Sequence, residues 1–345
     1  MYAKTRGEAQ ERLRAALTEA HAGIRPTSAR LTVERFLADW IETSVGPRCR
    51  PRTAGSYAST VRLYIVPAIG RVPLARLEPA HVQRMLVDLA GRSPALSPTT
   101  VHYCYTVLRI ALGRALKSGQ VVRNVATLVD PPAAAAREIR PLSADQVRAF
   151  LDVVTGDRHE ALYTVAIALG LRQGELLALR WRDVDLDAGT LTVRHTLRIG
   201  TRELAEPKTD RARRTLRLGA DVAAVIRAHR TRQLEDRLAA GRRWRDCGFV
   251  FATPLGQPLD ANNVRHRLQA TLAAAGLPRQ RFHDLRHVCA TLLLEDGEEL
   301  GVISRILGHA DFSTTADGYA HLTPATLQRS ADRMDGILRR RAAPV

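Results

Sequence analysis

Four short segments in the second half of the chain hold side chains whose types and spacing suit chemistry on phosphate esters. The segments are ALGLRQGELLALRWRDVD, EPKTDRARRTLRL, HDLRHVCATLL and LGHADFSTTADGYAHLT. In that order they contain Arg172, then Lys208, then His283, Arg286 and His287, and finally His309 and Tyr319. Guanidinium, ammonium, imidazole and phenol groups occur together where phosphoryl groups are transferred.

Each residue type has a distinct use in such a reaction. Guanidinium groups bind the non-bridging oxygens of a phosphodiester in pairs and stabilise the charge that develops there. A tyrosine hydroxyl can attack phosphorus and form a covalent intermediate, although its ordinary pKa of about 10 calls for cationic neighbours or a base. Histidines transfer protons near neutral pH. Lys208 is one of only three lysines among 52 basic residues, and lysine can donate a proton that arginine retains.

Plainer interpretations of the same residues stay open when each is taken alone. Arg172 could be a surface charge at the end of a helix, and Lys208 could be a solvated turn residue. The last segment could be a helix, a polar turn and a second helix whose Tyr319 packs against the core. Only the combination of the four segments favours chemistry.

A metal site is the other use that two of the histidines suggest. His283 and His287 lie four positions apart, which puts them on one face of a helix like a zinc pair. The metalloprotease pattern needs a glutamate directly after the first histidine, where this chain has Asp284. Arg286 between them would also place a cation beside the metal. We therefore expect no metal and no cofactor.

The elements that position these residues fall into two parts, of which residues 31–130 form the first. Apolar residues repeat there with the helical period, and the segment carries a net charge of +7, from 13 basic and 6 acidic residues. Ser97 as N-cap and Pro98 after it mark the start of one helix, which Gly119 ends. We expect four helices, at 31–45, in a segment that stops near Pro67 and Gly70, at 78–91 and at 97–119.

A proline- and alanine-rich linker at 131–140 separates this part from the second, at 141–338. Ser143 and Gln146 form a capping box at the start of its first helix. The following pattern predicts helices around 160–169 and from Gln173, strands within 189–197 and 213–218 around a turn-rich 200–212, and further helices to about 338.

Composition favours a nucleic-acid partner. The chain of 345 residues has a formal net charge of +17, which attracts polyanions. No apolar run approaches the roughly 20 residues of a membrane span, and the charged start is no signal peptide. The cysteines are scattered, without a CxxC pair, and are typical of reduced thiols. These features predict a cytoplasmic, nucleoid-associated protein with no membrane partner.

The four segments resemble the tyrosine recombinases, or phage integrase family, and the likeness extends from about residue 31 through nearly all of the chain. The resemblance implies a mainly α fold with a small β-sheet, in which a SAM-like core-binding domain and a catalytic domain clamp DNA. It makes Tyr319 the nucleophile and Lys208 the general acid. It makes Arg172 and Arg286 the phosphate clamp, completed by His283 and His309. The supporting residues that it implies are Glu175, Asp183 and His287.

The resemblance also implies partners and an order of modules. Residues 1–28 give only a helix pattern, which we interpret as a possible remnant of an arm-binding domain, and residues 339–345 form a basic tail. The expected partners are double-stranded DNA attachment sites and further copies that build a tetramer on two duplexes. A directionality factor or a DNA-bending host protein is the accessory partner that the resemblance implies. A helix from about Pro324 packs on its own domain or on a neighbouring protomer through Leu327, Met334 and Leu338.

Two other functions share parts of this pattern. A type IB topoisomerase uses similar tyrosine chemistry, but the separate core-binding domain and the turn that carries Lys208 favour a recombinase. A DNA-binding regulator could keep the fold and lose the activity. All six candidate catalytic residues are present in this chain, which favours a site-specific integrase that cuts and rejoins DNA through a 3′-phosphotyrosyl intermediate.

Overall fold

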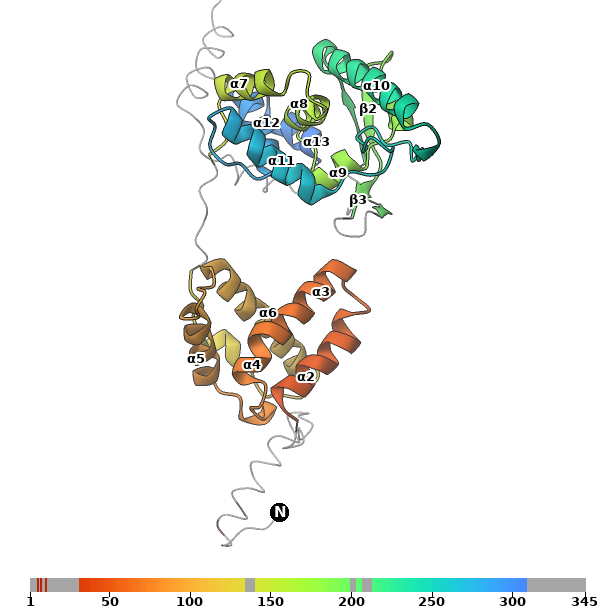
Figure 1. Ribbon diagram of the computed structural model, residues 1–345. Helices are drawn as coiled ribbons and strands as arrows, with labels where there is room; N and C mark the ends of the chain where they lie inside the picture. The colour runs from red at the N-terminus through yellow and green to blue at the C-terminus, as the bar shows by residue number, and fades with distance from the viewer. Residues whose placement is uncertain are drawn as a thin grey trace, which may run out of the picture. The chain divides into compact units, whose positions relative to one another are not determined.

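The computed structural model describes residues 31–133, 140–198, 203–206 and 213–308, together with Thr5, Gly7 and Gln10. The chain divides into two compact units, with the division between Glu138 and Ile139 (Figure 1). Most of the helix pattern expected at 1–28, most of the linker and the chain beyond residue 308 lie outside the described residues.

Unit 1 is helical throughout its described part. Its helices are α2 (Val33–Trp40), α3 (Pro51–Thr60), α4 (Val66–Ile69), α5 (Pro79–Ala90) and α6 (Pro98–Lys117), with π-helical turns η1 (Ile41–Val45) and η2 (Val61–Ile65) and short 3-10 turns η3 (Leu74–Arg76) and η4 (Val125–Leu128). Apolar side chains from all the α-helices but α3 are buried in one core, to which α3 adds partly buried neighbours. The hydroxyl of Ser97 accepts a hydrogen bond from the backbone N–H of Thr100 at 3.2 Å, so the cap predicted for α6 is present.

The helix ends near Pro67 and Gly70, as the sequence predicted, but Pro67 itself lies within its last turn. The chain runs on through α3, η2 and α4 as far as Ile69, and Gly70 is the residue that caps it. The π-helical turn lies directly before the proline, and its wider ring is closed by a bond from the N–H of Val66 to the carbonyl of Val61. A π-turn changes the local spacing of backbone carbonyls, so the proline ring, which clashes in a regular helix interior, is accommodated.

Unit 2 combines helices with two small sheets. The helices are α7 (Ala144–Val154), α8 (Glu160–Leu169), α9 (Gln173–Leu177), α10 (Ala220–Ala240), α11 (Ala261–Ala274), α12 (Asp284–Glu295) and α13 (Leu300–Leu307), with 3-10 turns η5 (Trp181–Asp183) and η7 (Gly241–Arg243). The capping box predicted at the start of α7 is present, since Ser143 and Gln146 exchange side chain to backbone hydrogen bonds of 3.3 and 3.0 Å. The described part of the chain contains no helix that is both long and apolar enough to cross a membrane.

The sheets are antiparallel and small. Strands β1 (Val184–Asp185), β2 (Thr190–Val193) and β5 (Arg214–Arg217) form one sheet in that order, with Thr192 opposite Thr215. Strands β3 (Thr196–Leu197) and β4 (Leu204–Ala205) form a second sheet. Strand β4 lies in the segment that the sequence predicted to be turn-rich, and its two residues are too few to show an alternating pattern. The prediction of a mainly helical protein with small sheets is confirmed.

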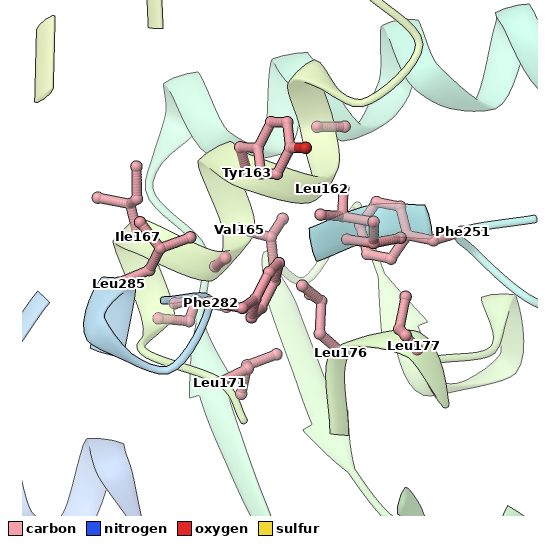
Figure 2. Packing of buried hydrophobic residues seen from close by; sticks show 14 of the residues in the cluster. Leu162, Tyr163, Val165, Ile167, Leu171, Leu176, Leu177, Phe251, Phe282 and Leu285 are labelled. Carbon is pink, nitrogen blue, oxygen red and sulfur yellow. The ribbon is translucent and has the colours of Figure 1, made fainter. Parts of the chain in front are cut away.

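The core of unit 2 fixes the helices that carry the candidate site. Buried side chains from α7, α8, α9, α11 and α12 and from strands β2 and β5 form one cluster, of which Figure 2 shows labelled members such as Val165, Leu176 and Leu285. Helix α8 contributes seven buried residues, more than half of its length, so it is the central element. The residues directly after α8 and at the start of α12 therefore have rigid supports.

Candidate active site

Arg172 lies in a tight connection between α8 and α9. Gly170 ends α8 in the left-handed conformation, with φ of 57°, which glycine adopts without a steric penalty. Leu171 is buried, and Arg172 is the extended N-cap of α9. The buried residues on both sides of the connection thus fix the backbone position of Arg172.

The guanidinium of Arg172 is held from two sides and still reaches solvent. Its Nη1 donates to Oε1 of Glu175 at 2.7 Å, and its Nη2 donates to the carbonyl of Gly308 at 3.4 Å. Its side chain keeps 39% of its surface exposed. An arginine has five N–H donors, so donors remain for an external anion.

Glu175 is a buried carboxylate shared by two arginines. Oε1 pairs with Arg172, and Oε2 pairs with Nη2 of Arg214 at 3.1 Å. Burial by itself would raise the pKa of Glu175, but the charges of Arg214 and Arg172 outweigh it and lower that pKa below its ordinary value. Glu175 is therefore an anion at neutral pH and holds the guanidinium of Arg172.

Arg214 on β5 is the residue that the sequence interpretation missed. Only 8% of its side-chain surface is exposed, which is unusual for a charged residue. A signal was present: successive strand residues point to opposite faces, so Arg214 shares the inward face with Leu216, two positions later. In a chain so rich in arginine, this alternation did not stand out.

Arg286 joins the same connection from the other side. It is the third residue of α12, only 2% exposed, and its Nη1 donates to the carbonyl of Gly170 at 2.8 Å. This bond attaches α12 to the residue two positions before Arg172. The structure thus brings the two predicted clamp arginines to one turn, although 114 positions separate them in the sequence.

The two histidines predicted beside Arg286 lie next to each other. The rings of His283 and His287 are 5.5 Å apart and nearly perpendicular. Partial burial lowers the pKa of His283, and His287 together with nearby arginines lowers it further. Burial is also the main cause that lowers the pKa of His287. Both shifts favour the neutral imidazole, which can accept a proton or donate one hydrogen bond.

Asp183 pairs with a residue outside this arrangement. It is buried at the end of η5, and its Oδ1 lies 3.1 Å from Nε of Arg194, just beyond β2. Its ion pair thus ties η5 to the chain after β2, whereas Glu175 pairs with Arg172 directly. We interpret Asp183 as a support for the three-stranded sheet.

The remaining predicted residues, Lys208, His309 and Tyr319, lie outside the described residues. The described chain stops on both sides of Lys208, at Glu206 and Arg213, and it ends at Gly308. Among the residues that are described, no cluster of three or more histidine, cysteine, aspartate or glutamate side chains could hold a metal ion.

Two arginines at one turn, with two imidazoles beside them on a helical scaffold, are groups that the sequence led us to expect for chemistry on phosphate esters. The chain belongs to the phage integrase family, whose model matches residues 140–326. A second model, the N-terminal SAM-like domain of phage integrases, matches residues 32–90. Members of this family, the tyrosine recombinases, are site-specific recombinases that transfer DNA strands.

Individual relatives agree over almost the full length. An integrase of Streptomyces ambofaciens is 31% identical, over 98% of this chain and 88% of its own. A tyrosine recombinase XerC-like protein of Caldanaerobacter subterraneus subsp. tengcongensis is 28% identical, over 97% of this chain and 91% of its own. The structure of the Tn1549 transposon integrase in complex with a circular intermediate DNA shares the fold, with a TM-score of 0.76 and 21% identity over 88% of this chain and 99% of its own.

Proposed function

We propose that this protein cuts and rejoins duplex DNA at attachment sites of a mobile element, with Tyr319 as the nucleophile. One observation carries the proposal: Arg286 donates to the carbonyl of Gly170, two positions before Arg172, and His283 lies at the start of the same helix as Arg286. Two guanidinium groups at one place can hold both non-bridging oxygens of a scissile phosphate. Family membership supplies the reaction class.

The bond changes follow from the residue types. The Tyr319 oxygen attacks phosphorus and loses its proton to a neighbouring imidazole, and the bond from phosphorus to the 5′ oxygen breaks. Lys208 protonates that leaving oxygen, which gives a 3′-phosphotyrosyl linkage and a free 5′-hydroxyl. Attack of a 5′-hydroxyl on the linkage reverses the step and rejoins DNA. The linkage keeps the energy of the broken ester, so we expect activity without a metal or a nucleotide.

Sequence positions support the roles given to residues outside the described part. His309 directly follows Gly308, whose carbonyl accepts a hydrogen bond from Arg172, and consecutive Cα atoms lie about 3.8 Å apart. Lys208 belongs to the connection between β4 and β5, and β5 carries Arg214. Each of these residues is thus joined by a short piece of chain to the arginine cluster.

DNA is the partner that the relatives suggest. The Tn1549 transposon integrase is described in complex with DNA, and a lambda integrase tetramer is described bound to a Holliday junction. By extension, we propose that unit 1 is the core-binding domain, that unit 2 is the catalytic domain, and that four copies assemble on two duplexes. The net charge of +17 supports binding to a polyanion.

Trapping on a suicide substrate tests the proposal. Nicked duplexes tiled across the DNA that flanks the gene would be incubated with the wild type and with Tyr319→Phe, which removes only the hydroxyl. We expect a covalent adduct with the wild type on one duplex and none with the variant, while both bind that duplex equally.

Three other results would contradict the proposal. An adduct with Tyr319→Phe would refute the nucleophile. DNA binding without any adduct in the wild type would indicate a regulator. Relaxation of plasmids that lack the flanking sequence, by dilute protein, would indicate a topoisomerase.

A further inference from the structure

We propose that Arg214 is a positioning residue for DNA cleavage, which holds Glu175 so that Arg172 keeps donors free for the scissile phosphate. The proposal rests on the proposed function, and Arg214 is not among the residues of the predicted site. Its role is indirect, since it acts on the phosphate only through the carboxylate of Glu175.

The geometry makes Arg214 a bridge between three segments. From strand β5 its Nε donates to the carbonyl of Ile306 at 2.7 Å, near the end of α13. Its Nη2 donates to Oε2 of Glu175 on α9 at 3.1 Å. One planar group therefore joins α9, β5 and α13 in fixed directions, which a flexible ammonium could not do with the same geometry.

The space around this guanidinium is closed. A Cβ placed on Gly308 would lie 2.9 Å from Nη1 of Arg214 and 3.2 Å from its Cδ. Gly308 also has φ of 67° and ends α13, so glycine meets two needs at this position. The end of α13 rests directly on Arg214, and the carbonyl of Gly308 faces Arg172.

Charge explains why cleavage depends on this bridge. Glu175 accepts from Arg172 twice, through the side chain at 2.7 Å and through the backbone N–H at 3.2 Å. Arg214 takes part of the hydrogen-bonding capacity of the carboxylate and neutralises its charge. Without Arg214, the buried carboxylate of Glu175 would keep only Arg172 of these two arginines as a partner. It would then draw the guanidinium of Arg172 away from the phosphate.

The test measures adduct formation at saturating duplex, separately from affinity, on the suicide duplex that the wild type cleaves. Arg214→Met keeps the aliphatic bulk and removes the charge. We expect cleavage to slow by about 100-fold, the loss that a 1 Å misplacement can cause in a positioned site, with affinity little changed. Arg217→Met is the matched control, because Arg217 is exposed on the same strand. This variant should cleave like the wild type.

A second substitution distinguishes charge competition from general damage. The double variant that combines Arg214→Met with Glu175→Gln lacks the carboxylate that would compete with the phosphate for Arg172. We therefore expect it to cleave faster than Arg214→Met alone. A 5′-bridging sulfur, which makes the leaving group independent of its acid, should not restore Arg214→Met, because the defect lies in the clamp.

The outcomes separate this proposal from the proposed function. No adduct with the wild type would refute the function and leave no rate to compare. An adduct with the wild type and an equal rate for Arg214→Met would overturn the role of Arg214, as would a double variant no faster than the single one. Should Arg214→Met fail to fold, judged by its melting temperature, Arg214→Lys replaces it. Slow cleavage by Arg214→Lys supports the need for a planar bridge, and a wild-type rate overturns it.

Discussion

Gly170→Ala tests whether one backbone position sets the distance between the two clamp arginines. An alanine Cβ at position 170 would lie 2.5 Å from Cδ2 of Leu307 and 3.2 Å from Sγ of Cys289. Both neighbours are buried, at 0% and 2% exposure, so neither can turn into solvent. The substitution therefore forces α12 or α13 to move away from α8, and Arg286 moves with α12.

The expected destabilisation has two parts. A side chain in the left-handed conformation costs about 1–2 kcal/mol, and overpacking a closed core costs about 1–3 kcal/mol. The free energy of unfolding should fall by about 2–5 kcal/mol, a large share of the roughly 5–15 kcal/mol of a typical domain. We expect cleavage to fall further than stability alone explains, because the substitution would displace the bond from Arg286 to the carbonyl of Gly170, which is 2.8 Å long in the wild type.

Gly156→Ala provides the matched control for this prediction. Gly156 also has a positive φ, of 77°, but a Cβ there would meet nothing within 4 Å, so only the conformational cost of about 1–2 kcal/mol applies. Urea titration, with hydrogen exchange followed in peptides of α8 and α12, gives the free energies. Equal destabilisation by the two substitutions would refute the packing argument, and so would wild-type cleavage by Gly170→Ala.

Three further predictions concern the reaction, the partner and pH. Lys208→Ala should lose cleavage of an ordinary phosphodiester and regain most of it with a 5′-bridging sulfur; equal impairment on both substrates would contradict an acid role. Affinity for duplex DNA should fall with salt by about 0.9 log units per log unit of salt for each neutralised phosphate, and a flat response would exclude binding through phosphates. Burial lowers the pKa of His229, whose Nε2 bonds the carbonyl of Val250 at 2.8 Å. The unfolded chain then binds the proton more readily, so stability should be full above the unfolded pKa of about 6.5 and should fall as pH drops below it. Urea titrations at several pH values should show a weaker dependence for His229→Gln, and an unchanged dependence would contradict this assignment.

Local signals allowed most helix boundaries to be predicted from the sequence. A capping side chain acts within three residues, as Ser97 and Ser143 do, and Gly170 marks the end of α8 by its own conformation. The end of the helix near Pro67 and Gly70 was predicted correctly, but the place of Pro67 inside its last turn was not. The usual effect of proline is offset there by a π-helical turn, which depends on packing and leaves no mark in the sequence.

The candidate site was predictable as far as residue types and short spacings determine it. Glu175 reaches Arg172 within one helical turn, so the segment itself contains the contact. Arg214 meets Ile306 across 92 positions, and only the folded chain shows that pairing. Asp183 belongs to the same segment as Arg172, but its ion-pair partner is Arg194, which only the folded sheet brings to it.

The π-helical turn η2 also has a consequence for insertions and deletions. A π-turn holds one residue more in its hydrogen-bonded ring than an α-helix does, so the helix from α3 to α4 contains one residue beyond regular spacing. Removing one residue from Val61–Ile65 would convert the π-turn into a regular α-helical turn and leave the faces of the following residues nearly unchanged, because the turn has absorbed that extra residue. Removing a residue from the regular part of α3 would instead rotate all that follows by about 100°, the angle per residue at 3.6 residues per turn. Ile69, now 4% exposed in the core, would then turn away from it. Unit 1 should therefore tolerate a one-residue deletion in this turn far better than one in α3.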